Sequence, residues 1–504
     1  MFSIFSVVYG LLLLCLLFTY FFHNLFLAGK VPKNLPWVGI KNQPLGWLRA
    51  LAYTIPTLPE VLLDVHKQVG QPHLSAEPYP SLLVDANVEF PVQEPSCERL
   101  QLDYTLPFMT IISRPLYHRL LIKILTLKGG SVVAEIYDEL QQTCDHELGL
   151  DTEQWKSVCV YDSMQHIVLT ASNRMIIGPP LCRNKRYLTT ICRYAQLIFP
   201  IGVLVRSFPL FVRPVVGRVF GIPALYLFAQ YKRYNLPVIK QHLANIDHAA
   251  VDANHEFTPL NTFLTWYIEE ARKTPQAREI TKPETISSML MAVNSAAVFS
   301  GTIIGTYILF NILASDPEHG TIENLRNEIE RVLADANGEW SKATLAKMYR
   351  LDSVLRETLR FDPLDALTLQ RKAMKDVVTE DGLLLERGTN VAISSYTIHR
   401  DEENYPSAEV FDPFRFSRAT DERSSRDSSS SITPSETYLP FGHGRHACPG
   451  RWFARMKLKL LVAYIFMNYD IQPVAPKPRG FWAATFYLPP TKARIMVRRR
   501  AKNA

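Results

Sequence analysis

Residues 441–450 read Phe-Gly-His-Gly-Arg-His-Ala-Cys-Pro-Gly, and the single cysteine of this run, Cys448, stands among three glycines. The glycines and the Pro449-Gly450 pair allow a tight loop whose backbone N–H groups point at the sulfur, and such donors favour a thiolate over a thiol. Residues 451–467 have a helical pattern, and the positive N-terminal end of a helix also favours a negative sulfur. The run therefore predicts a thiolate that is held in a loop and tuned to bind a metal.

Three other kinds of site compete for the same loop. A zinc site could use His443, His446 and Cys448, but the chain has no second ligand cluster at zinc-finger spacing. A phosphate-binding loop would need a Gly-Lys-Ser or Gly-Lys-Thr sequence, which does not follow. The third alternative is a purely structural cysteine, and the loop by itself leaves that alternative open.

A group of charges lies upstream of this loop. Apolar residues recur at helical spacing between positions 351 and 359, which predicts the buried face of a helix. Glu357 and Arg360 are three residues apart and share a face of that helix, where they could form an ordinary surface ion pair. Arg415, within Pro413-Phe-Arg-Phe416, supplies a third charge. The three residues are expected to form a Glu–Arg–Arg network that locks the cysteine loop.

The composition is that of a globular protein with a large core. The 504 residues are 47% hydrophobic and 20% charged, and the net charge is +7. Basic residues crowd the C-terminus, which favours an anionic membrane surface or an acidic protein partner, whereas no module for nucleic acid accompanies them. The seven cysteines are odd in number and have no paired spacing, which indicates a reducing compartment and no disulfide framework.

The N-terminus predicts a membrane anchor. Residues 2–22 carry no charge, and a helix of this length spans a bilayer core of about 30 Å. A cleaved signal peptide would need basic residues before the apolar run and a small-residue cleavage site after it, and neither is present. Lys30 and Lys33 follow the run and place the body of the protein in the cytoplasm. We expect an anchor at 2–22, a proline-containing linker at 23–39 and a single domain at 40–504.

The domain is expected to be mainly α-helical with minor β-structure. The pattern is helical from about residue 110 to 360, and proline, glycine and β-rich pieces follow. Residues 417–437 contain a serine tract and are expected to form an exposed insertion. Residues 285–315 are uncharged but too polar for a lipid-facing span, so a buried central helix explains them better. Residues 197–231 could enter the membrane interface or simply cover the core, and both alternatives remain open.

Taken in this order, the motifs resemble those of a cytochrome P450, specifically the fungal microsomal type. The cysteine-loop pattern of that family, F-x-x-G-x-R-x-C-x-G, is matched at its Phe, Gly, Cys and Gly positions, while His446 replaces the usual arginine. Glu357 and Arg360 match the family's E-x-x-R, and residues 413–416 match its P-x-R-F. The resemblance implies haem b, iron protoporphyrin IX, as the cofactor and Cys448 as its iron ligand.

The resemblance also implies roles for other residues. Phe441 and His446 would bind the haem, and the charge of His446 would depend on pH. Arg119 and Arg371 are candidate partners of the haem propionates. Glu357, Arg360 and Arg415 would be structural rather than catalytic.

The sequence departs from the family on the expected oxygen-binding side. Alignment on Asp316-Pro317 places Ser300 at the family's acid position and Gly301 at its threonine position, with Thr302 directly after. Ala297, Ser300 and Gly301 share one helical face, which is expected to meet the haem. Ser300 and Thr302 are the candidate catalytic residues, unless an ordered water or a substrate hydroxyl supplies the proton path. A register longer by one residue would return Thr302 to the alcohol position.

The resemblance implies a haem-thiolate monooxygenase that oxidises a lipophilic, terpenoid- or polyketide-like secondary metabolite with O2. Electrons would come from an NADPH-dependent reductase, and the protein would be a single-pass protein of the endoplasmic reticulum membrane with a cytosolic catalytic domain. Substrate contacts are expected from residues 364–369 and 481–487. Two alternatives remain open: a haem-thiolate isomerase, dehydratase or desaturase that inserts no oxygen, and a non-catalytic membrane haem protein.

Overall fold

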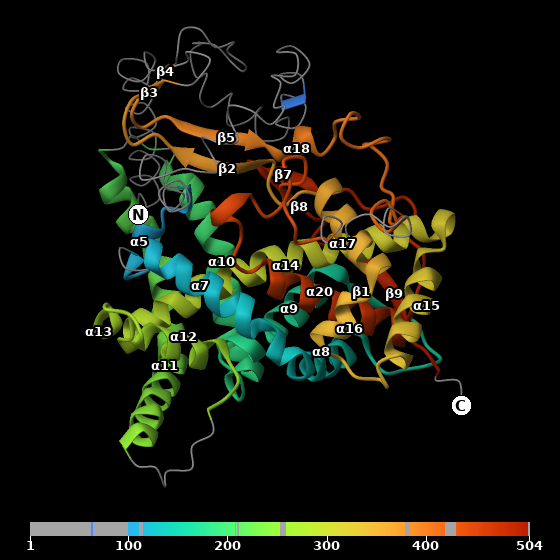
Figure 1. The fold of residues 1–504 in the computed structure, drawn as a ribbon, viewed down its shortest axis with the longest axis horizontal. Coiled ribbons are helices and arrows are strands. Elements are labelled where there is room, and N and C mark those ends of the chain that lie inside the picture. Colours follow the sequence, from blue (N-terminus) through green and yellow to red (C-terminus); the bar gives the residue numbers. More distant parts are fainter. Residues whose placement is uncertain are drawn as a thin grey trace, which may run out of the picture.

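The structure is a computed structural model, and it describes residues 62–63, 99–109, 114–206, 208, 211–251, 259–378, 384–418 and 430–501. The predicted anchor and linker at 2–39 lie outside these residues. The described part is mainly helical with several small antiparallel sheets, as the sequence predicts (Figure 1). The α-helices are α5 (Leu102–Thr105), α7 (Pro115–Lys128), α8 (Val133–Leu148), α9 (Val160–Ile176), α10 (Lys185–Arg206), α11 (Arg213–Val251), α12 (Phe263–Arg272), α13 (Ala277–Ile280), α14 (Pro283–His319), α15 (Thr321–Ala334), α16 (Lys342–Ala346), α17 (Tyr349–Phe361), α18 (Ser395–Ile398) and α20 (Arg451–Asn468).

Helix α14 crosses the middle of the molecule and packs against α9, α10, α11, α15, α17 and α20 (Figure 1). Pro283 occupies its first turn, and Gly320 ends it in the left-handed conformation with φ 56°. Within the described residues, α14 and α10 are long and apolar enough to cross a membrane by length and composition alone. The apolar window of α14 is 78% buried inside the protein, so this uncharged run is the central core helix that its polar residues predicted.

The strands form a minor part of the fold at its periphery. Strands β1 (Lys156–Cys159), β9 (Arg494–Arg499) and β6 (Tyr469–Ile471) form an antiparallel sheet with β9 in the centre. Three further pairs are β2 (Leu367–Lys372) with β5 (Asn390–Ser394), β3 (Val377–Val378) with β4 (Leu384–Leu385), and β7 (Phe481–Ala483) with β8 (Phe486–Leu488). Three short 3-10 helices, η1 (Gly129–Val132), η2 (Leu181–Arg183) and η3 (Gly444–His446), complete the elements.

The C-terminal arginines, expected to form a free basic patch, have partners in the fold. Arg499 donates to Asp145 Oδ1 at 2.6 Å, and Arg498 and Arg500 lie 3.6 and 3.7 Å from the carboxylate of Asp470. These contacts hold β9 and the residue that follows it against α8 and β6. Much of the charge of this segment is therefore neutralised locally.

Residues 417–437 are expected to form an exposed insertion, but part of the described segment 430–437 is buried. Ser431 and Ile432 are buried, and the Ser431 hydroxyl donates to Asp352 Oδ1 at 2.9 Å. The backbone N–H of Ser431 donates to the other oxygen of the same carboxylate at 2.9 Å. Asp352 accepts these bonds because its buried carboxylate needs several donors, and this requirement brings the serine tract down onto α17. Residues 419–429 lie outside the described part.

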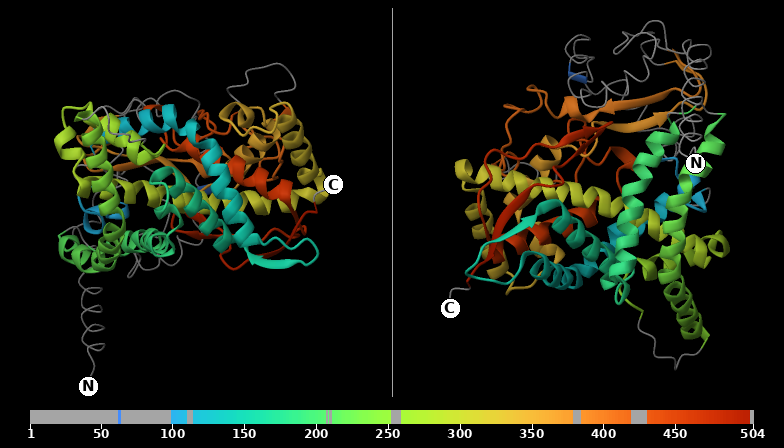
Figure 2. Two further views of the ribbon diagram at one scale, coloured as in Figure 1. Left: turned by 90° about the horizontal axis from the view of Figure 1, so that it is seen from below. Right: turned by 180° about the vertical axis from the view of Figure 1, so that it is seen from behind.

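Helices α10 and α11 pack side by side at one end of the molecule (Figure 2). Tyr187 and Tyr231 stack between them with ring centroids 5.1 Å apart. The N-terminal half of α11 nevertheless exposes large apolar side chains, which include Val215, Val219 and Ile222 at 56–65% exposure. The region 197–231 therefore covers the core with one face and presents apolar surface with the other.

Candidate functional site

The cysteine loop takes the tight form that its glycines predict. Gly442 and Gly444 adopt positive φ angles of 70° and 68°, a conformation that costs glycine little. The backbone N–H of Cys448 donates to the carbonyl of Phe441 at 2.8 Å and closes the loop. Helix α20 begins directly after the loop, so Cys448 lies beside its N-terminal end.

Cys448 lies inside the molecule and still presents an accessible surface. Burial raises the pKa of its thiol, while the backbone N–H groups of Gly450 and Arg451 and the charge of Arg451 lower it. The residue nevertheless has solvent-accessible surface. A side chain that is surrounded by protein and still accessible is expected where it faces an internal space. N–H donors aimed at the sulfur and room beside it fit a thiolate ligand of a bound metal group, which would deprotonate the thiol outright.

Arg371 supplies a second observation that fits an anionic cofactor. Its side chain is only 2% exposed on β2, and burial lowers its pKa to about 10. One guanidinium nitrogen donates to the carbonyl of Gln370 at 2.9 Å, while Nε and the other terminal nitrogen have no hydrogen-bond partner among the described residues. A buried cation is retained where an anion pairs with it, so Arg371 fits the propionate role predicted for it.

The other residues predicted to contact the cofactor are Phe441, His446 and Arg119, and they lie in different surroundings. Phe441 is half-buried and packs against the main core cluster. The ring of His446 lies 5.8 Å from that of His118 on α7, so α7 does approach the cysteine loop. Arg119, the next residue of α7, is exposed. Arg119 therefore stays a prediction, and His118 is the residue of α7 that the structure places beside the loop.

Glu357, Arg360 and Arg415 meet as a buried ion network. Neither Glu357 nor Arg360 has exposed side-chain surface, and Arg360 makes two bonds of 2.7 and 2.8 Å to the two carboxylate oxygens. Arg415 Nε lies 3.2 Å from each of these oxygens. The backbone N–H of Asp412 also donates to Glu357 at 3.0 Å. The carboxylate is therefore fully compensated, as a buried charge requires.

His399 connects this network to the cysteine loop. Arg360 donates to the carbonyl of His399 at 2.6 Å, and the Nε2 atom of His399 accepts a bond from the backbone N–H of Leu439 at 3.0 Å. Leu439 in turn accepts a bond from Gly442 at 3.1 Å. Burial, together with nearby arginines, lowers the pKa of His399 to about 3, which keeps the ring neutral and able to accept. The sequence alone does not predict this connecting role of His399.

The expected oxygen-side residues of α14 do not share one environment. Ala296 is exposed in the middle of this buried helix, and Ser300, one turn later, is half-buried and donates its hydroxyl to the Ala296 carbonyl at 2.7 Å. Gly301 is buried on another side, where a Cβ would lie 2.9 Å from Val168 Cγ1 and 3.2 Å from Lys457 Nζ. Ala297, Ser300 and Gly301 are expected to face the haem together. In the structure Gly301 instead packs against α9 and α20, and Ser300 lies on the more accessible side of the helix.

Thr302 also points into the core. It is 1% exposed, and its hydroxyl oxygen has no hydrogen-bond partner among the described residues. Lys457, which approaches α14 from α20, is 1% exposed and donates to Ser172 Oγ at 2.7 Å. Burial lowers the pKa of Lys457 to about 7. The sequence does not single out this lysine, because Arg455 and Lys459 lie close to it in the same helix.

The two segments predicted to contact substrate come together. Ala366 donates to the carbonyl of Thr485 at 2.8 Å, and Tyr487 donates to that of Leu364 at 3.2 Å. Phe486 then meets aromatic rings from two helices: its centroid lies 4.7 Å from that of Phe199 on α10 and 5.7 Å from that of Phe299 on α14. Three distant parts of the chain thus form one aromatic cluster beside the exposed stretch of α14.

Comparison with known proteins shows the family of this chain. The family model described as Cytochrome P450 matches residues 127–497. The chain is similar to cytochrome P450 monooxygenase astC of Aspergillus terreus, with 31% identity over 420 residues that cover 80% of this chain and 77% of the relative. It is similar at 31% identity to cytochrome P450 monooxygenase pbrC of Penicillium brasilianum, over 80% of this chain and 77% of the relative, and to cytochrome P450 monooxygenase 151 of Postia placenta, over 80% and 79%.

The match to the family model spans the cysteine loop, the ion network and α14, and the buried arginine and the accessible thiol fit the haem that the family binds. The monooxygenase assignment is thereby favoured over the isomerase, dehydratase or desaturase alternative. The chain belongs to the cytochrome P450 family, and it is a haem-thiolate monooxygenase.

Proposed function

We propose that this monooxygenase oxidises a lipophilic secondary metabolite of terpenoid or polyketide size, with electrons from an NADPH-dependent reductase. The observation that carries the proposal is Cys448, a thiol inside the protein that faces an accessible space and receives backbone N–H groups. Haem bound to this sulfur would supply dioxygen activation, which the protein side chains cannot perform. The chain's own contribution is to hold the group, shape the cavity and handle protons.

Arg371 and the cysteine loop would hold the haem from two sides. One nitrogen of the Arg371 guanidinium is held by the Gln370 carbonyl, while the other two have no hydrogen-bond partner among the described residues, and they would bind a propionate. Glu357 and Arg360 would act only through the loop, to which His399 links them. We therefore propose a positioning role for the ion network and a binding role for Arg371.

Ser300 is the hydroxyl that α14 offers on its accessible side, and we propose it as the residue that orients a proton donor there. Its O–H donates to the Ala296 carbonyl, so its oxygen lone pairs remain available to accept a bond from a water or a substrate hydroxyl. The equivalent role for Thr302 is less well supported, because its side chain is buried in the core. An alcohol at position 301 would crowd Val168 Cγ1 and Lys457 Nζ, which lie 2.9 and 3.2 Å from the position of a Cβ.

The substrate class follows from the surfaces beside α14. The cluster of Phe199, Phe299 and Phe486 offers aromatic and apolar contacts and few hydrogen-bonding groups, which suits a ligand that is itself apolar. Arg99 Cζ lies 4.1 Å from the ring centroid of Phe486 and donates to Asp365 and Thr485, so one polar edge borders this cluster. We propose that this edge contacts an oxygen atom of the substrate.

We also propose that residues 2–22 anchor the protein in the endoplasmic reticulum membrane in a single pass, with 23–39 as a linker and the domain in the cytosol. Their apolar composition and the exposed apolar face of α11 support this location. Fractionation of cells that express the full chain and a chain lacking residues 2–22 tests the proposal. The full chain is expected with microsomes after a salt wash, whereas equal release of both chains to the soluble fraction would contradict an anchor.

Turnover with labelled dioxygen tests the proposed chemistry. The holoprotein with an NADPH-dependent reductase is incubated with ¹⁸O2 and an extract of lipophilic metabolites, and products are compared by mass spectrometry. We expect a product that gains one labelled oxygen and requires NADPH, and Ser300→Ala should yield less labelled product per NADPH consumed than Thr302→Val. A product without label that forms in the absence of the reductase would return the assignment to an isomerase or dehydratase, and unlabelled product that requires NADPH would indicate a desaturase.

A further inference from the structure

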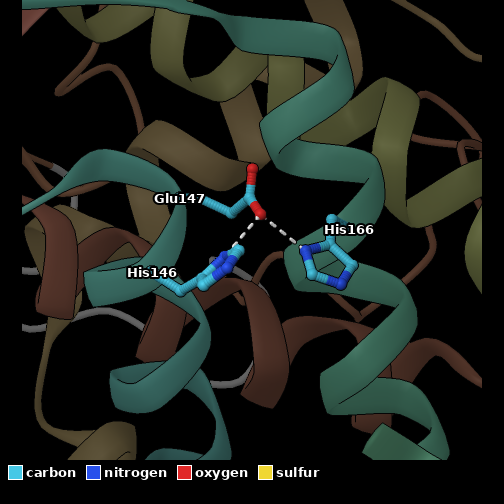
Figure 3. Close-up of side chains that lie close together, drawn as sticks. All are labelled: His146, Glu147 and His166. Atoms are coloured by element: carbon cyan, nitrogen blue, oxygen red, sulfur yellow. Dashed lines mark hydrogen bonds and ion pairs between the residues drawn. The ribbon is translucent and has the colours of Figure 1, made fainter. Parts of the chain in front are cut away.

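A cluster of three metal-ligating side chains lies outside the haem site, where the end of α8 meets α9. His146 and Glu147 belong to the last turn of α8, and His166 lies in the second turn of α9 (Figure 3). The Nδ1 atoms of His146 and His166 lie 3.0 and 2.7 Å from the same atom, Oε1 of Glu147. The three possible ligand atoms all lie within 4.8 Å of one another.

The donor set suits a divalent transition metal. Two imidazole nitrogens and one carboxylate oxygen are ligands typical of Zn²⁺, Co²⁺ and related ions. A tetrahedral ion with bonds of about 2.0–2.1 Å holds its ligand atoms roughly 3.3 Å apart. The two separations from the carboxylate oxygen, 2.7 and 3.0 Å, would have to widen by a few tenths of an ångström, and the two imidazole nitrogens, which lie within 4.8 Å of each other, would have to reach the same spacing. Side-chain rotation alone could supply a change of this size.

The local electrostatics also favour a cation. The hydrogen bond from His166 lowers the pKa of Glu147, with a smaller contribution from His146, although partial burial opposes this change. The carboxylate is therefore ionised at neutral pH. The cluster lies at the C-terminal end of α8, where the helix dipole is negative. Lys156 Nζ donates to the backbone carbonyl of Glu147 at 2.8 Å, so this nearby cation binds the helix end and leaves the carboxylate oxygens to the histidines.

Access to the cluster is open. The side chains of His146, His166 and Glu147 are 65%, 35% and 21% exposed, so an ion can enter from solvent and water can complete its coordination. We propose that His146, Glu147 and His166 form a surface binding site for a divalent transition-metal ion of the Zn²⁺ class. The ion would join α8 to α9, and these helices pack against α20 and α14 respectively. Its role would therefore be structural, separate from that of the haem.

Zinc binding to the full-length holoprotein tests the site. The protein is purified without a polyhistidine tag, treated with a chelator and titrated with Zn²⁺ by calorimetry, and its metal content is measured after desalting. We expect one Zn²⁺ per chain and a Zn²⁺-dependent rise in the thermal unfolding midpoint. His166→Ala and Glu147→Gln should each weaken binding by at least about ten-fold, as expected for the loss of a ligand.

A matched control is available at the end of α14. His319 lies 3.9 Å from the carboxylate of Glu318, and no third metal-ligating side chain joins this pair among the described residues. His319→Ala should bind Zn²⁺ as the unchanged protein does. The haem spectrum of each variant shows that the domain is folded. Equal Zn²⁺ binding by the unchanged protein and His166→Ala, or no binding by the unchanged protein, would overturn the proposal and leave a hydrogen-bonded triad.

Discussion

Glu357 shows how the surroundings of one residue determine what it can do. Its carboxylate has no exposed surface and receives bonds from Arg360, Arg415 and a backbone N–H. In water such a pair contributes little, but inside the protein each charge depends on the others. The network therefore holds several loop carbonyls in place, among them those of Pro406 and Ala408.

Glu357→Gln keeps the size of the side chain and removes its charge. The buried guanidinium of Arg360 and the half-buried one of Arg415 then lack their anion, and we expect a loss of about 3–5 kcal/mol in the free energy of unfolding. The fraction of purified protein that carries haem should fall as well, because the cysteine loop depends on His399. Both quantities are measured by denaturant unfolding and by the haem-to-protein absorbance ratio.

Glu409→Gln is the matched control for this substitution. Glu409 also pairs with an arginine, Arg400, at 3.3 Å, but its side chain is 64% exposed. We expect a loss below about 1 kcal/mol there. If the two variants lost the same free energy of unfolding, the buried network would not stabilise the fold more than an exposed ion pair does.

At the scale of elements, the packing of α14 against α9 and α20 explains why a glycine stands at position 301, which the sequence motif does not explain. The chain position of Gly301 matches that of a family threonine, and the structure shows no room for one: Val168 Cγ1 lies 2.9 Å from the position of a Cβ. The same helix has a second glycine, Gly305, where a Cβ would make ordinary contacts of 3.6 Å. A side chain at position 301 would therefore clash with its neighbours, whereas a side chain at position 305 would change mainly the helix propensity.

Gly301→Thr is expected to cost about 1–3 kcal/mol, the usual penalty of an overfilled core, and not to improve turnover. Gly305→Ala should be neutral or stabilise the protein by up to about 1 kcal/mol, since alanine favours a helix. Thermal unfolding of the two holoproteins measures the difference. A Gly301→Thr protein that is as stable as Gly305→Ala and more active would show that Gly301 faces the oxygen-binding side after all.

The elements also show which parts of this molecule can be predicted from its sequence. The cysteine loop, the ion network and the buried helix at 285–315 follow from local patterns of glycine, charge and polarity, and the structure contains each of them. The orientation of α14 does not follow, because it depends on how closely Val168 and Lys457 approach from other helices. For the same reason the sequence suggested Arg119 and gave no sign of His118, whose ring meets the loop only in three dimensions.

Across the whole molecule, burial of lysines inside the core makes stability depend on pH. Lys457 has a folded pKa of about 7, lowered by burial, whereas lysine in an unfolded chain has a pKa of about 10.4. Below pH 7 both states carry the proton, and the folded state bears the full cost of the buried charge. Between pH 7 and 10 only the unfolded state keeps the proton, so the contribution of Lys457 to stability rises with pH.

Lys457→Met removes this titration. We expect the variant to be more stable than the unchanged protein at pH 7, and we expect the difference to shrink by up to about 1.4 kcal/mol per pH unit as the pH rises to 9. Denaturant unfolding at several pH values measures it, and Lys347→Met at an exposed position of the chain is the control. A difference that stays constant from pH 7 to 9 would mean that Lys457 remains charged in the folded protein.

We propose that the function of the whole molecule depends on one sulfur atom, that of Cys448. All supporting contacts, from the Glu357 network to the N-terminal end of α20, converge on the loop that holds Cys448. Cys159 provides a matched comparison, because it is a half-buried cysteine whose thiol donates to the Thr491 carbonyl at 3.2 Å.

The difference spectrum of the reduced, CO-treated holoprotein tests this dependence most directly. The unchanged protein and Cys159→Ala should both show the red-shifted Soret band of a thiolate-ligated haem, and Cys448→Ala should lack it while the protein remains helical by circular dichroism. A Cys448→Ala protein that kept the red-shifted band would contradict the assignment of Cys448 as the haem ligand.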